Sequence, residues 1–221
     1  MADEVGPTEQ GTAYHEAGHA VLAHHLFGSG AVAELTITPD EDYLGAMTRS
    51  PEYLELRKKL ITYAEGGIAG VILQADKDWW EANDLATDWG GDPTYDGWDD
   101  DQVDEEGQRL YHLCDLLINV CIAGHVAEEL FSGTPNQTTE DSDWREAKDL
   151  ATSLMRCERT AEGDDCSHYF DVAWGVTKHI MREKYIAAIY ALVGQLLEKK
   201  TLTGAEVSET IESNMLLLGN T

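Results

Sequence analysis

The sequence predicts a mainly α protein with one small β element. Apolar residues recur at helical spacing through most of the 221 residues, whereas the alternation typical of a strand is confined to a short stretch around residue 35. Glycine and proline punctuate the chain between the helical segments. The length and an ordinary apolar fraction of 43% predict a single domain, residues 1–221.

The helical segments are separated by recognisable start and stop signals. Thr8 or Thr12 is expected to cap the first helix, and Gly28 follows its last residue. A β-branched stretch at 33–38 and a second stretch at 44–48 are expected to pair as a hairpin. Pro51 opens the next helix. The expected helices are 8–27, 51–73, 108–131, a helix from Glu140 or Ser142 to Arg159, 173–200 and 205–218.

Residues 76–106 form an acidic, tryptophan-rich insertion. They contain thirteen acidic residues and four of the six tryptophans, and glycines and a proline interrupt any periodicity. Long loops inside domains are usually functional or disordered. The stretch from Asp92 resembles a calcium loop, but its twelfth position is Val103 where an EF-hand has a glutamate. A solvated acidic flap is therefore the expectation, with a calcium site as the alternative.

Charge and cysteine content restrict the partners and the compartment. The net charge of −27 repels nucleic acid and anionic membrane surfaces. No apolar run approaches the ~20 residues of a membrane span. The first ten residues lack the layout of a signal peptide, so a cytoplasmic location is expected. The four cysteines form no CxxC pair and are expected to be reduced, buried thiols.

Residues 15–19, His-Glu-Ala-Gly-His, are the motif that carries chemistry. His15 and His19 are four residues apart, so both imidazoles lie on one helix face and reach a single ion. Glu16 is placed to take a proton from water in the open position of that ion. The pattern predicts a Zn²⁺ site with Glu16 as general base. A catalytic zinc needs a third protein ligand, which spacing alone does not select.

The chain also resembles a known family in several segments. His15 to Ala20 is similar to the zinc helix of FtsH-type peptidases, the proteolytic part of the membrane-bound AAA proteases. Residues 123–130, Ala-Gly-His-Val-Ala-Glu-Glu-Leu, resemble the family's Gly-Gly-Arg-x-Ala-Glu-Glu helix, with Ala123 and His125 replacing its Gly and Arg. Further similar segments are 34–39 with 44–45, 142–143 with 147–155, and 197–198 with 201–207, and all the segments occur in the family's order.

The resemblance implies that Asp143 is the third zinc ligand. It opens the segment that resembles the family's aspartate helix, and thirteen residues lie between Glu129 and Asp143. Asp141 and Asp84 remain alternatives. Asp84 lies in Asn-Asp-Leu-Ala-Thr, which resembles the same aspartate helix, although it falls within the insertion. Glu128 and Glu129 are candidates for orienting a ligand histidine.

The sequence therefore predicts an FtsH-like zinc metallopeptidase that hydrolyses peptides or unfolded proteins. It contains no GxxxxGK[ST] motif and no membrane span, so a stand-alone form that does not use ATP by itself is expected. A homo-oligomer, or a separate ATPase or adaptor, remains open as the partner. The alternative is a non-enzymatic zinc-binding or partner-binding protein of the same fold.

Overall fold

A computed structural model describes residues 8–39, 44–51, 53–55, 105–133, 142–153, 158–160 and 163–215. Its helices are α1 (Glu9–Phe27), α4 (Glu105–Ser132), α5 (Ser142–Ser153), α6 (Ser167–Ile180), α7 (Ile186–Lys199) and α8 (Gly204–Asn214), with a π-helical segment η1 (Met181–Tyr185) between α6 and α7. Its strands are β1 (Val32–Thr36), β2 (Ala46–Arg49), β3 (Glu158–Thr160), β4 (Gly163–Asp165) and β5 (Thr201–Thr203). The predicted mainly α fold with a small β element is confirmed.

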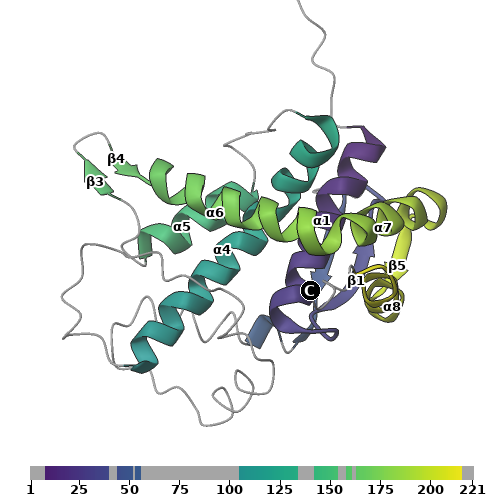
Figure 1. Cartoon of the computed structure of the whole chain (residues 1–221), viewed down its shortest axis with the longest axis horizontal. Helices are drawn as coiled ribbons and strands as arrows, with labels where there is room; N and C mark the ends of the chain where they lie inside the picture. Colours follow the sequence, from purple (N-terminus) through teal and green to yellow (C-terminus); the bar gives the residue numbers. More distant parts are fainter. Residues whose placement is uncertain are drawn as a thin grey trace, which may run out of the picture.

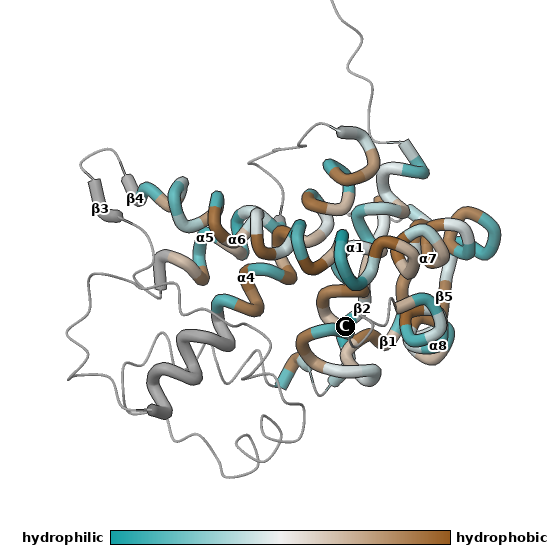
Figure 2. Tube along the Cα trace, viewed as in Figure 1, coloured by the Kyte–Doolittle hydropathy of each residue, from teal (hydrophilic) through white to brown (hydrophobic). Residues whose placement is uncertain are grey.

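Helix α1 is the centre of the hydrophobic core. It lies between α4 and α7, with the sheet and α8 on one side and α5 with the β3–β4 hairpin on the other (Figure 1). Figure 2 shows hydrophobic residues running along α1 and α7. Residues on all sides of α1 are buried, so the polar side chains on it are enclosed by the same packing that forms the core.

The ends of α1 and α8 follow from local capping. The Thr8 hydroxyl accepts a hydrogen bond from the Gly11 amide at 3.0 Å, and Gly28 ends α1 with a φ of 82°. Thr203 and Glu206 form a reciprocal capping box at the start of α8. The expected cap at Thr8 and the stop at Gly28 are therefore confirmed.

The small sheet has three antiparallel strands in the order β2-β1-β5. β1 and β2 pair as the expected hairpin, with Thr36 opposite Ala46 and Val32 opposite Arg49. β5 was not predicted; it pairs with the other side of β1 and joins the C-terminal part of the chain to the sheet. Its three residues are too short to produce a readable alternation.

Three other expectations were wrong. The helix expected to reach Arg159 does not reach it: α5 is described as far as Ser153, and Glu158–Thr160 pairs with Gly163–Asp165 as a hairpin. The helix expected from residue 173 begins at Ser167, where the Asp165 carboxylate accepts a hydrogen bond from the Ser167 amide. Cys166 is disulfide-bonded, because pairing depends on proximity in space and not on a CxxC spacing.

Much of the expected helix 51–73 and residues 76–104 of the predicted insertion lie outside the described residues. The last two insertion residues, Glu105 and Glu106, belong to α4. Pro51 is helical, as expected of the residue that opens the next helix.

Candidate metal centre

Three donor atoms from α1 and α5 lie close to one another. The Nε2 atoms of His15 and His19, one turn apart on α1, are 3.0 Å from each other. Asp143 is the second residue of α5, and its Oδ2 lies 3.0 Å from His15 Nε2 and 3.1 Å from His19 Nε2. The structure thus brings together the three residues that the sequence analysis named as ligands, although 124 residues separate His19 from Asp143.

The other ring nitrogen of each histidine is held by α4. His15 Nδ1 lies 2.6 Å from Glu128 Oε1, and His19 Nδ1 lies 2.7 Å from the carbonyl oxygen of Val120. A carbonyl oxygen only accepts, so the His19 proton is assigned to Nδ1 and the Nε2 lone pair faces Asp143. Such contacts orient metal-binding histidines in known sites.

This donor set fits a divalent cation. Three atoms that each offer a lone pair repel one another at 3.0–3.1 Å unless a positive charge lies among them. A tetrahedral zinc with bonds of about 2.0–2.1 Å holds its ligands roughly 3.3 Å apart, close to these separations. Two imidazoles and one carboxylate leave a fourth position for water or substrate.

In the metal-free protein a proton can supply that charge. Burial lowers the pKa of His15, but its hydrogen bonds to Asp143 and Glu128 raise the pKa to about 10. Burial raises the pKa of Asp143, yet the charges and hydrogen bonds of His19 and His15 hold it well below its ordinary value. At neutral pH the metal-free centre therefore holds a protonated His15 beside an ionised Asp143.

Glu16 lies at the same centre and is almost fully buried. Its residue is 7% exposed, and burial raises the pKa of its carboxyl, while the charges of His19 and His15 oppose that effect. Gly45, just before β2, packs on it: a methyl group at Gly45 would lie 3.0 Å from Glu16 Cγ. A carboxylate with a raised pKa beside a cation site has the properties of a general base.

Two glycines allow α1 and α4 to approach each other closely. A methyl group at Gly18 would lie 2.5 Å from the Ala123 carbonyl oxygen, which explains a glycine inside the His-Glu-Ala-Gly-His helix. A methyl group at Gly124 would lie 2.6 Å from the Nε2 atoms of both His15 and His19. Gly124 therefore forms the wall against which both imidazoles rest.

A second group of candidate donors shares His15. His15, His125 and Glu128 also have donor atoms within 4.8 Å of one another. The predicted role of orienting a histidine fits Glu128 and not Glu129, whose carboxylate accepts hydrogen bonds from Trp174 and Lys178 of α6. Asp84 and Asp141 lie outside the described residues.

Sequence reasoning missed three contributors to this centre. Val120 acts through its carbonyl oxygen, so its side chain gives no signal. Gly124 and Gly45 act through the space that they leave, and glycine inside a helix signals a close approach without identifying the neighbour. Elsewhere on α1, His25 Nδ1 lies 2.9 Å from the Tyr185 hydroxyl.

Replacing Gly124 with alanine is expected to weaken zinc binding at least tenfold. The new methyl group would displace both imidazoles, and changes that only reorient ligands cost about 10–100-fold in metal affinity. The matched control is Gly175→Ala on the exposed face of α6, where a methyl group meets open space; it should stabilise the fold by up to about 1 kcal/mol. Chelator competition and thermal unfolding measure both effects, and native zinc affinity in Gly124→Ala would contradict this role.

Zinc binding at pH 7 is expected to release about one proton per ion. His15 carries a proton below its raised pKa of about 10, and a metal ligand must be deprotonated. Apparent zinc affinity should then rise with pH, up to roughly tenfold per unit, until the pKa of His15 is passed. Titration calorimetry in two buffers of different ionisation enthalpy counts the protons. A count of zero would show that His15 is neutral before zinc binds.

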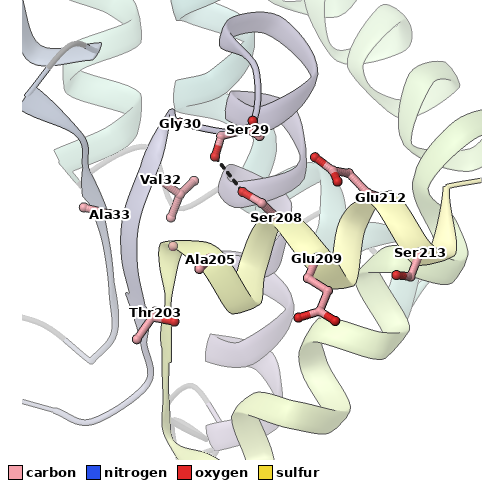
Figure 3. A pocket seen from close by; sticks show the side chains of 11 residues that line it. Ser29, Gly30, Val32, Ala33, Thr203, Ala205, Ser208, Glu209, Glu212 and Ser213 are labelled. Atoms are coloured by element: carbon pink, nitrogen blue, oxygen red, sulfur yellow. Dashed lines mark hydrogen bonds between the residues drawn. The ribbon is translucent and has the colours of Figure 1, made fainter.

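A shallow pocket of about 720 Å³ lies elsewhere, between the start of β1 and α8. Figure 3 shows Ser208 on α8 hydrogen-bonded across it to the backbone of Ser29, at 2.6 Å, with Glu209 and Glu212 nearby. Its lining includes none of the histidines or carboxylates described above. It is a groove between two packed elements, remote from the chemistry.

The arrangement of these residues defines a class of site. Two histidines at i and i+4 on a helix, with a glutamate after the first and a carboxylate from another helix, form the pattern of metal-dependent hydrolases.

Among the described residues no helix has the length and apolar character to cross a membrane.

Comparison with known proteins points to one group of proteases. No protein-family model matches the chain. Over 100 residues, 38% of the chain, it is 36% identical to the ATP-dependent zinc metalloprotease FtsH of Thermus thermophilus. Over 220 residues, 90% of the chain, it is 23% identical to the ATP-dependent zinc metalloprotease FTSH 9, chloroplastic/mitochondrial, of Oryza sativa subsp. japonica. The chain spans 16% and 21% of the lengths of these relatives. It therefore contains a region similar to FtsH.

Proposed function

We propose that the protein is a zinc-dependent peptidase, with His15, His19 and Asp143 as the metal ligands and Glu16 as the general base. The observation that carries the proposal is the convergence of the three donor atoms within 3.0–3.1 Å of one another, beside a buried glutamate. The similarity to two zinc metalloproteases supports the same chemistry.

Each residue has a separate task in this mechanism. Zinc in such a site lowers the pKa of water and polarises the carbonyl of the scissile bond. Glu16 takes the proton of the attacking water and later delivers it to the departing amine. Burial raises the pKa of the Glu16 carboxyl, which makes its carboxylate a stronger base. Glu128 and the Val120 carbonyl keep the two imidazoles oriented throughout.

The substrate class of the proposal is peptides or unfolded protein segments. The ATP-dependent relatives are several times longer than this chain, so their ATP-driven activity is not transferred to it. Folded substrates would need a separate ATPase or adaptor to deliver them, and the proposal does not identify such a partner.

The second candidate function is a non-enzymatic zinc-binding protein. It would use the same ligands but would have no need for Glu16, whose burial beside the donor atoms carries a desolvation cost. The position of Glu16 thus favours the peptidase.

The test measures zinc content and peptide cleavage on the same purified full chain. About one zinc per chain and cleavage of an unfolded, fluorescently labelled casein are expected, with cleavage abolished by a chelator and restored by one equivalent of zinc. Zinc binding without any cleavage would support the non-enzymatic alternative, and absence of zinc affinity would overturn both.

A further inference from the structure

Arg49 is a cation at the far end of the strand that borders the candidate centre. β2 starts beside Glu16, on which Gly45 packs, and ends at Arg49. Four residues of strand at about 3.3 Å each place Arg49 roughly 13 Å along the strand from Gly45. Among the described strands β2 is at the edge of the sheet, with β1 on one side and no described strand on the other.

Arg49 also reaches the helix that carries the third donor. Its Nη1 lies 3.8 Å from Oε2 of Glu146 on α5, and Glu146 is three residues after Asp143. Residues three apart lie on the same face of a helix, about 5–6 Å from each other. The guanidinium therefore lies between β2 and α5, within about a helical turn of Asp143, and it experiences the charges of both carboxylates.

The guanidinium retains hydrogen-bonding capacity. An ion pair at 3.8 Å is longer than a hydrogen bond, and the ring of Tyr53 covers one face of the group, 5.5 Å from Cζ to the centroid. Among the described residues the buried Nε has no hydrogen-bond partner. The Arg49 side chain is 20% exposed, so solvent or a ligand has access to it. A planar fork with five donors is matched by a carboxylate.

We propose that Arg49 is a specificity-determining residue that binds a carboxylate of the peptide in the site. This inference rests on the proposed function, because it needs a peptide lying between β2 and α5. The carboxylate belongs either to an aspartate or glutamate side chain a few residues from the scissile bond or to the C-terminus of the peptide. Glu146 holds the guanidinium in place while the peptide is absent.

The negative net charge of the protein distinguishes a local preference for a carboxylate from general electrostatic attraction. With a net charge of −27, the protein repels an acidic peptide at long range. General electrostatics therefore predict that glutamate weakens peptide binding at every position. A glutamate that strengthens binding at one position needs a local cation.

The test uses the zinc-loaded full chain carrying Glu16→Gln, so that bound peptide is not consumed. The probes are dansyl-labelled nonapeptides of alanine and leucine with a single glutamate at each position in turn, each paired with its glutamine counterpart. A second set lacks glutamate and differs in a free or amidated C-terminus. Fluorescence anisotropy gives the dissociation constants.

We expect one carboxylate position, in a side chain or at the C-terminus, to improve binding about tenfold over its neutral counterpart. Arg49→Gln should abolish that preference without weakening the neutral peptide, and Arg49→Lys should keep only part of it, because an ammonium lacks the fork. The control Arg145→Gln removes the same charge from an exposed position of α5 and should keep the preference.

The outcomes separate this inference from the proposed function. A missing preference, or one that survives Arg49→Gln, overturns the role of Arg49 even if the native protein cleaves peptides. A preference that depends on Arg49 in a protein that cleaves nothing upholds Arg49 and overturns the peptidase. Failure of every peptide to bind overturns both.

Discussion

Glu16→Gln is expected to reduce peptide cleavage by about 100-fold or more while zinc remains bound. The amide keeps the size of the carboxylate in a buried position, so the packing against Gly45 is preserved. It cannot take a proton from water, and general bases typically contribute about 10²–10⁴-fold. Because Glu16 is not among the three converging donors, zinc content should not change.

Cleavage rates and zinc content of the variant and the native protein measure this effect. The matched control is Glu198→Gln, the same change at an exposed position of α7, which should leave both quantities at the native level. Turnover near the native level in Glu16→Gln would remove Glu16 from the mechanism, and loss of zinc would make it a ligand.

Asp143→Asn is expected to lower zinc affinity by at least about 100-fold. Mutation of residues that only contact a metal ligand costs about 10–100-fold in metal affinity, and replacing a ligand itself should cost no less than the upper end of that range. The amide removes the negative charge that faces both imidazoles at 3.0–3.1 Å. Helical content should survive, since Asp143 is partly exposed in the first turn of α5. The small loss of helix-dipole stabilisation is expected to be about 0.3–1 kcal/mol.

The alternatives Asp84 and Asp141 provide the controls for this change. Asp84→Asn and Asp141→Asn should bind zinc nearly as tightly as the native protein. Competition with a chelator ranks all three variants on one scale. If Asp84→Asn loses zinc first, the third ligand comes from residues 76–106 and the interpretation of Asp143 is wrong.

Local signals in the sequence predicted the part of the site that lies on one helix. His15, Glu16 and His19 share α1, and the 3.6-residue period places both imidazoles on one face. Asp143 comes from another helix, and only the family resemblance selected it. Gly18 on α1 lets the backbone of Ala123 approach closely.

The sequence could not predict features that depend on packing. The Val120 carbonyl and Gly124 act on the histidines through backbone and space, which leave no periodic pattern. β5 was missed because three residues show no alternation. Its pairing depends on β1, which is distant in the sequence: Thr36 of β1 lies opposite Thr201 of β5, 165 residues further along the chain. The predicted division into a single domain with an insertion at 76–106 remains a prediction.

The measurement that tests the central claim most directly is a crystal structure of the zinc-loaded full chain, with data collected at the zinc absorption edge. We expect one anomalous peak bound by His15 Nε2, His19 Nε2 and a carboxylate oxygen of Asp143, at about 2.0–2.1 Å each. The Glu16 carboxylate should face the open fourth position without touching the metal. A peak bound by His125 and Glu128, or zinc held without Asp143, would contradict the account.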